Sequence, residues 1–323
     1  MVAFSVLIIT HGREELLLKC LNSLISPVEN WQLIIVANGL PLSEEVIQFA
    51  NSLTQDVEIV NLSKKETPGT SRNLGLKLVK YDWVFLIDDD AYLLPHYFDT
   101  ALPVLEKERV DVLGGPDFAA KGMGTFSQAL AITLSSPFCT GHTFARHQAK
   151  GKNLRPANEA MLSSCNLWIK SRLLQEVQFP EDYLRTEETA LLLDLESRGA
   201  RMFYHPGLGV GHHRRKNILE LVRPTFYAGY YRSKVLVDKS LKNSYLFWLP
   251  TIFVLLHLVI FVSPDLFWAM VRIYLGVIVM MSLNLGARRK RIGLFVQISF
   301  LHYFVVFMYG VGFLRHRLGF AWK

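Results

Sequence analysis

The chain has 323 residues, of which 50% are hydrophobic and 20% charged, and its formal net charge is +7. Most of the apolar surplus lies after Ser244, which argues for a soluble α/β domain followed by a membrane region rather than a wholly soluble protein. Basic residues are concentrated at 201–242 and 288–291, beside apolar segments, which indicates contact with anionic lipid headgroups. The chain has no zinc-finger spacing and no RNA-type aromatic motif, so we expect no nucleic-acid partner.

The N-terminal segment is predicted to begin a folded domain. Phe4–Ile9 is rich in β-branched residues and ends at Thr10-His11-Gly12, the pattern of a buried strand followed by a turn. The run is short and no cleavage-site pattern follows it, so we expect no signal peptide. The chain's three cysteines form no CxxC pair and no disulfide framework, which is typical of a reducing compartment.

Apolar strand patterns then alternate with helical patterns along the first part of the chain. Strands are predicted at 4–9, 31–36, 57–62 and 83–87, with helices at 14–24, from 43 and over 67–79. Such a series predicts an α/β fold, with a parallel sheet covered by helices on both faces and ligands bound beyond the carboxyl ends of the strands. Residues 114–160 are rich in Gly, Ser and His and are expected to form irregular loops over the active site.

Three adjacent aspartates, Asp88, Asp89 and Asp90, follow the fourth predicted strand. Like charges this close repel one another and raise each other's pKa unless a cation lies between them. Mg²⁺ and Mn²⁺ prefer carboxylate oxygens and often bridge to phosphates. The triplet therefore favours a divalent metal that binds a nucleoside diphosphate, with a solvated acidic turn as the alternative.

Four segments together resemble family 2 glycosyltransferases of the GT-A fold, over roughly residues 4–213. They are SVLIITHGREELLLKCLNSL, TPGTSRNLGLKLVKYDWVFLIDDD, SSCNLWIKSRLLQEVQFPED and YLRTEETALLLDLESRGARMFYHPGLGVGHH, in this order. The resemblance implies a Rossmann-like nucleotide-diphospho-sugar transferase domain at 1–213, followed by an α-helical membrane region. The tail, with FYAGYYRSKVL, resembles members that build bacterial exopolysaccharide and lipid-linked glycans.

The resemblance also implies roles for individual residues. Asp88 and Asp90 match the metal-binding Asp-x-Asp pair, and the metal is Mg²⁺ or Mn²⁺. A family His at the position of His212 completes the metal shell or touches the diphosphate. The implied donor-binding residues are Thr10, Arg13, Asn38, Arg72, Asp88, Asp89 and Asn166. Ala37 stands where the family often has an Asp that contacts the nucleotide base, so the nucleotide stays open.

Glu188 matches the catalytic base, which is an Asp in the family, and Glu187 is the alternative. The implied reaction is a single displacement with inversion, in which the acceptor hydroxyl gives its proton to Glu188 as it attacks the anomeric carbon. The implied function is transfer of a sugar from a nucleotide-sugar donor to a lipid-linked or polysaccharide acceptor in cell-surface glycan synthesis. A polyprenyl-phosphate sugar synthase and a catalytically weak partner in a membrane complex are the alternatives.

The tail is predicted to contact membrane lipids. Residues 214–243 have the pattern of a basic amphipathic interfacial segment, and 244–323 that of transmembrane helices at about 244–263, 265–286 and 292–314. By the positive-inside rule, GARRKR at 286–291 is expected on the cytoplasmic side of the cell (inner) membrane. The catalytic domain, which precedes the first predicted span, is expected on the same side. The topology of the third segment stays open, because a full span would leave Arg315 and Arg317 outside.

Overall fold

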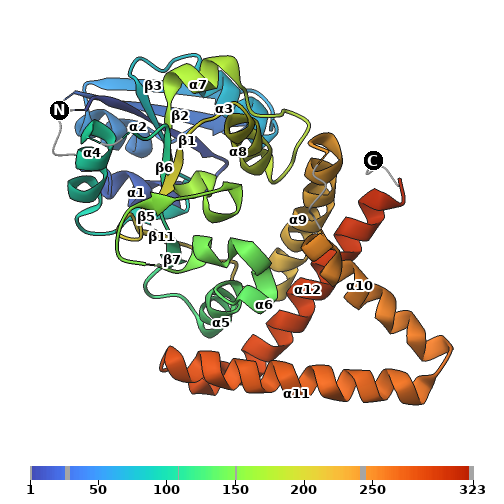
Figure 1. Ribbon diagram of the computed structural model, residues 1–323. Helices are drawn as coiled ribbons and strands as arrows, with labels where there is room; N and C mark the ends of the chain where they lie inside the picture. The colour runs from blue at the N-terminus through green and yellow to red at the C-terminus, as the bar shows by residue number, and fades with distance from the viewer. Residues whose placement is uncertain (1, 26–29, 108, 150, 241–244, 320–323) are drawn as a thin grey trace. The chain divides into compact units, whose positions relative to one another are not determined.

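The computed structural model describes residues 2–25, 30–107, 109–149, 151–240 and 245–319 (Figure 1). The chain divides into two compact units. We call them the sheet unit, residues 1–121 and 145–213, and the helical unit, residues 122–144 and 214–323. Residues 241–244, where the predicted interfacial segment meets the first predicted span, lie outside the described residues.

The sheet unit is built on an eight-stranded sheet with the order β3-β2-β1-β4-β9-β6-β10-β8. The four strands predicted from the sequence are parallel to one another. β9 runs antiparallel between β4 and β6, so the sheet is mixed, and the predicted α/β class is confirmed. The strands are β1 (Phe4–Thr10), β2 (Trp31–Asn38), β3 (Asp56–Leu62), β4 (Trp83–Leu86), β6 (Val112–Gly114), β8 (Arg155–Pro156), β9 (Leu167–Lys170) and β10 (Met202–Tyr204).

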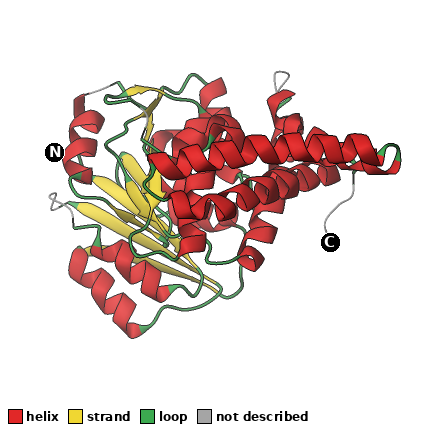
Figure 2. Ribbon diagram, turned by 90° about the horizontal axis from the view of Figure 1, so that it is seen from below, coloured by secondary structure: helices red, strands yellow, loops and turns green. Residues whose placement is uncertain are grey.

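Helices cover both faces of this sheet, because its strands are apolar on both sides (Figure 2). In β1, Phe4 and Ile8 pack against α1 (Glu14–Asn22), α2 (Glu44–Leu53) and α4 (Tyr97–Lys107). Leu7 points to the other face, which α3 (Pro68–Leu76), α7 (Ser171–Glu176) and α8 (Glu187–Ser197) cover. The predicted helices thus form with minor differences at their ends, and β1 is buried on both faces.

A second, three-stranded sheet lies at the carboxyl end of β4, with the order β5-β11-β7. Its strands are β5 (Ala91–Leu93), β7 (Asp117–Ala119) and β11 (Val210–His212). β11 pairs antiparallel with β5 and parallel with β7, so His212 lies opposite Ala91. This sheet therefore brings the end of β11 beside the acidic triplet, more than a hundred residues earlier in the chain.

The helical unit is organised around α12 (Phe295–Arg317), the last helix of the described chain. The carboxyl half of α12 packs closely on α9, because a Cβ on Gly312 would lie 2.0 Å from the carbonyl oxygen of Phe226. Its amino half contacts α5, where Leu301 and Leu130 belong to one apolar cluster. The other helices are α5 (Thr125–Leu134), α6 (Pro137–Thr140), α9 (Ile218–Asp238), α10 (Leu249–Leu256) and α11 (Pro264–Arg288).

Two parts of the chain differ from the sequence prediction. Residues 114–160 include β7, β8, the short α6 and the ten-residue α5 rather than irregular loops alone, and α5 packs on α12, far along the chain. Among the described residues, two helices are long and apolar enough to cross a membrane, Pro264–Arg288 and Ile292–Arg317. The segment predicted as the first span forms α10, flanked by 3₁₀ turns at Tyr245–Trp248 and His257–Phe261.

Candidate active site

Most of the predicted site residues lie at one edge of the large sheet. Thr10 ends β1, Asn38 ends β2, and the acidic triplet follows β4. Because these strands are parallel, their carboxyl ends meet at the same edge. The order of the sheet thus gathers residues that stand far apart in the sequence.

The middle aspartate of the triplet is held by neighbouring side chains. Asp89 is fully buried, and its Oδ2 accepts hydrogen bonds from Thr10 Oγ1 at 2.7 Å and from Arg13 Nε at 3.2 Å. Arg13 also pairs with Asp90. Burial raises the pKa of Asp89 to about 6, although the Arg13 guanidinium opposes this shift. Asp89 therefore ties Thr10 and Arg13 to the triplet.

Asp88, Asp90 and His212 present ligand atoms that all lie within 4.8 Å of one another. His212 Nε2 lies 3.1 Å from Asp90 Oδ1, and the main-chain N–H of His213 donates to the Asp90 carbonyl. Two carboxylates and an imidazole are a donor set that suits Mn²⁺, or Mg²⁺ with water and phosphate oxygens completing the shell. The residues present therefore fit the divalent metal that the sequence implies.

Arg72 connects the acidic triplet to the glutamate pair. Its buried guanidinium binds Glu187, and Nη2 donates to Asp88 Oδ1 and to Ser164 Oγ, both at 3.1 Å. Burial raises the pKa of Glu187, while Arg72 opposes the shift. A buried charge is costly unless it is paired, so the two carboxylates keep this cation in place. Glu187 is thereby engaged by Arg72.

Glu188 is the second residue of α8, and the helix is preceded by Thr186, whose φ of 62° is in the left-handed region. Such a backbone conformation is strained for a residue other than glycine, and it often occurs at functional sites. The Glu188 Oε1 accepts a hydrogen bond from Arg146 Nη1 at 3.1 Å. Arg146 is itself anchored by the carbonyl oxygens of Glu159 and Ala160. The sequence held no signal for Arg146, because it lies in a segment without a regular pattern.

The two predicted donor-binding asparagines both form hydrogen bonds within the protein. Asn38 exchanges hydrogen bonds with the main chain of Glu66, at 3.0 and 2.7 Å. Asn166 is fully buried; its Nδ2 donates to the Leu208 carbonyl at 2.6 Å and its Oδ1 accepts from the Tyr97 hydroxyl. These contacts give both residues a part in holding loops together, and their roles toward a donor stay predictions.

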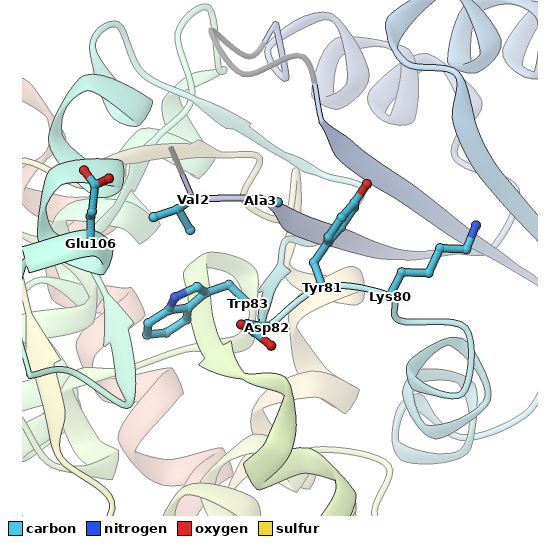
Figure 3. Close-up of a pocket in the computed structure, with 7 residues that line it drawn as sticks. All are labelled: Val2, Ala3, Lys80, Tyr81, Asp82, Trp83 and Glu106. Atoms are coloured by element: carbon cyan, nitrogen blue, oxygen red, sulfur yellow. The ribbon is translucent and has the colours of Figure 1, made fainter.

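A cavity of about 540 Å³ lies at the opposite edge of the sheet (Figure 3). It is lined by residues that precede β1, by residues just before and at the start of β4, and by one residue of α4; they are Val2, Ala3, Lys80, Tyr81, Asp82, Trp83 and Glu106. Because β1 and β4 are parallel, this cavity is at their amino ends. It is therefore separate from the acidic cluster.

The chain is similar to several known proteins. An uncharacterized glycosyltransferase of Haemophilus influenzae is 27% identical over 125 residues, which are 37% of this chain and 46% of that protein. S. aureus TarS 1–349 in complex with UDP-GlcNAc is similar with a TM-score of 0.55 and 14% identity, over 99% of this chain and 93% of that one. The mannosyltransferase PcManGT from Pyrobaculum calidifontis, in complex with GDP-Man and Mn²⁺, has a TM-score of 0.62 and 11% identity, over 98% and 87%.

The likeness to these structures shows the fold, and the predicted GT-A architecture is confirmed. The chain spans less than half the length of the curated relative, 46%, and of the longer TarS chain, 42%. The model of the family described as glycosyl transferase family 2 matches residues 5–178, which is more than half of the chain. The chain therefore belongs to glycosyl transferase family 2.

Proposed function

We propose that this glycosyltransferase is an inverting, metal-dependent enzyme that transfers a sugar from a nucleotide-sugar donor to a lipid-linked or polysaccharide acceptor in cell-surface glycan synthesis. The observation that carries the proposal is the grouping of Asp88, Asp90 and His212 at the carboxyl ends of the strands. Arg72 joins this group to the glutamate pair at the start of α8. A leaving diphosphate and an attacking hydroxyl need these two kinds of site side by side.

Each group has a distinct part in the proposed reaction. Asp88, Asp90 and His212 would hold a divalent metal, which when bound would supply Lewis-acid stabilisation of the departing diphosphate. Glu188 accepts the proton of the acceptor hydroxyl while that oxygen attacks the anomeric carbon from the opposite side. Arg72 holds Glu187 and Asp88 in place, and Arg146 orients Glu188 through its own anchored guanidinium. General-base help of this kind contributes about 10²–10⁴-fold in rate.

The nature of the donor is supported by the structural neighbours. TarS 1–349 is described with UDP-GlcNAc and PcManGT with GDP-Man and Mn²⁺. In this chain Ala37 is a fully buried residue of β2 and offers no side-chain hydrogen bond to a base. We therefore propose a nucleoside diphosphate sugar as donor. Turnover of a panel of nucleotide sugars would identify the nucleotide.

We also propose that the helical unit associates with a lipid bilayer. Large apolar side chains are exposed along the segment from α10 to α11, with Phe261 84% and Val262 88% exposed where the two meet. Exposed apolar patches of this kind mark surfaces that contact a membrane or another protein. Four basic residues, Arg288 to Arg291, follow at the end of α11, which suits a cytoplasmic membrane face. The inner membrane with the sheet unit in the cytoplasm is the location we propose.

The proposal is tested with full-length protein purified in detergent and a panel of nucleotide sugars that includes UDP-GlcNAc and GDP-Man. Release of nucleoside diphosphate is measured with Mn²⁺, with Mg²⁺ and with a chelator, with and without added membrane lipid extract. We expect metal-dependent release from one donor, and its loss in Asp90→Ala, since that substitution removes a metal ligand. Release that is equal with chelator, or equal in the variant, would contradict metal dependence; silence across the panel with lipid extract would contradict the enzymatic function.

A further inference from the structure

Asp117 is a buried carboxylate, 3% exposed, that no step of the proposed reaction uses. Its Oδ2 lies 3.1 Å from His212 Nδ1 and accepts from Cys165 Sγ at 3.7 Å, and its Oδ1 lies 2.5 Å from His147 Nδ1. A buried charge is stable only when it is hydrogen-bonded or paired. Both carboxylate oxygens of Asp117 are thus engaged by groups that can donate to them.

His212 stands between this carboxylate and the metal ligands. Its Nδ1 faces Asp117, while its Nε2 faces Asp90 Oδ1 at 3.1 Å. Asp117, Cys165 and His212 form one group of close ligand atoms, and Asp88, Asp90 and His212 form the other. A single imidazole therefore links the two groups, with one ring nitrogen turned toward each.

The small sheet sets this alignment. Asp117 begins β7, and His212 ends β11, its parallel neighbour in the β5-β11-β7 sheet. Main-chain pairing holds the two segments at a constant spacing, so the carboxylate and the imidazole meet without depending on a mobile loop. The site therefore has a built support on the side of His212 that faces away from the triplet.

We propose that Asp117 is a positioning residue that accepts a hydrogen bond from the Nδ1–H of His212, and so leaves the Nε2 lone pair directed at the site of the divalent metal; this rests on the proposed function. A neutral imidazole carries its proton on only one nitrogen, and the hydrogen bond at one nitrogen decides which. Carboxylates that hold metal-binding histidines in this way typically change metal affinity by about 10–100-fold. His147 and Cys165 hold Asp117 in place.

The test measures Mn²⁺ affinity by electron paramagnetic resonance on full-length protein, without any sugar donor. Asp117→Asn keeps the shape of the side chain but offers a single oxygen, so it cannot accept from both His147 and His212. We expect Mn²⁺ binding to weaken by about 10–100-fold. The matched control is Asp111→Asn, which alters another buried carboxylate, at the amino end of β6 and bound to Arg201 and Arg172; its Mn²⁺ affinity should match the wild type.

A second measurement shows directly which ring nitrogen of His212 is protonated. Nitrogen-15 spectra of histidine-labelled protein, assigned with His212→Gln, show which ring nitrogen bears the proton, with or without metal. We expect a proton on Nδ1 in the wild type and a changed pattern in Asp117→Asn. A bare Nδ1 in the wild type, or equal Mn²⁺ affinity and an equal spectrum in the variant, would overturn the inference. A wild type that has the Nδ1 proton but no Mn²⁺ affinity would instead refute the metal in the proposed function.

Discussion

Seven Asp, Glu and Arg side chains with less than 9% exposure lie in the described part of the sheet unit, whereas the described part of the helical unit has one, Arg232, and exposes large apolar side chains along α10 and α11. The seven are Arg72, Asp89, Asp90, Asp111, Asp117, Glu187 and Glu188. In the helical unit, Trp268 is 55% exposed and Ile273 is 70% exposed. Each unit thus departs from the usual rule of charged residues outside and apolar residues inside, and the two depart in opposite directions.

The difference separates two sources of stability. In the sheet unit, each buried charge has partners in the protein, as Arg72 has in Glu187 and Asp88, because an unpaired charge would cost several kcal/mol. In the helical unit, exposed apolar side chains along α10 and α11 are not packed against the protein, and an apolar surface of this kind marks a site of contact with a membrane or another protein. The buried charges beside the acidic triplet support the proposed reaction, and the exposed apolar surface of the helical unit supports the proposed association with a bilayer.

The largest expected effect comes from the buried charges that the proposed reaction uses. Glu188→Gln should lower turnover by about 10²–10⁴-fold, because the amide cannot accept the proton of the acceptor hydroxyl. Donor affinity should stay near the wild-type value, since the substitution leaves Asp88 and Asp90 in place. Turnover and donor binding are measured on the same preparations with the donor found in the panel. Unchanged turnover in Glu188→Gln, or a much larger loss in Glu187→Gln, would transfer the role of base to Glu187.

A smaller effect is expected at the glycines of the two long helices in the helical unit. Gly312→Ala places a Cβ against the Phe226 carbonyl and should cost about 1–3 kcal/mol of unfolding free energy by overpacking α12 against α9. Gly276→Ala on α11 is the matched control, because nothing lies within 4 Å of its added Cβ. Chemical denaturation in detergent measures both variants. Equal destabilisation would show that α12 is no more tightly packed than α11.

The smallest effect is expected at a buried charge outside the site. Burial alone would raise the pKa of Asp111, but hydrogen bonds from Arg201 and Lys170 hold that pKa well below its usual range. A carboxyl group with a lowered folded-state pKa adds stability that is present above its unfolded pKa and is lost as pH falls. Asp111→Asn should therefore cost about 1–2 kcal/mol near pH 7, and the difference from wild type should shrink below about pH 4.

Unfolding followed by circular dichroism at a series of pH values checks this expectation for Asp111→Asn. The direction of the pH dependence is the diagnostic feature, because loss of packing alone would cost the same free energy at each pH. A difference that grows toward acid pH would show that the Asp111 carboxylate does not stabilise the fold through its ion pairs.

Much of the sheet unit follows from local sequence patterns. The apolar runs at 4–9, 31–36, 57–62 and 83–87 correspond to β1 to β4, because short apolar runs bounded by turn residues favour strands of a sheet. The acidic triplet was recognisable for a similar reason, since three adjacent carboxylates need a cation or a set of donors. Glu187 and Glu188 stood out only through the resemblance to a family, and spacing alone would have made them an ordinary helix start.

What only the tertiary structure decided is the choice of partners between distant residues. Arg146 contacts Glu188 across 42 positions, and Asp117 contacts His212 across 95, so no local pattern announces either pair. In the same way α11 and α12 have similar composition, yet Gly312 lies against α9 while Gly276 contacts nothing nearby. Local sequence determines which segments are apolar or charged; which of them meet depends on chain topology, because burial and pairing energies act between residues that only the folded chain brings together.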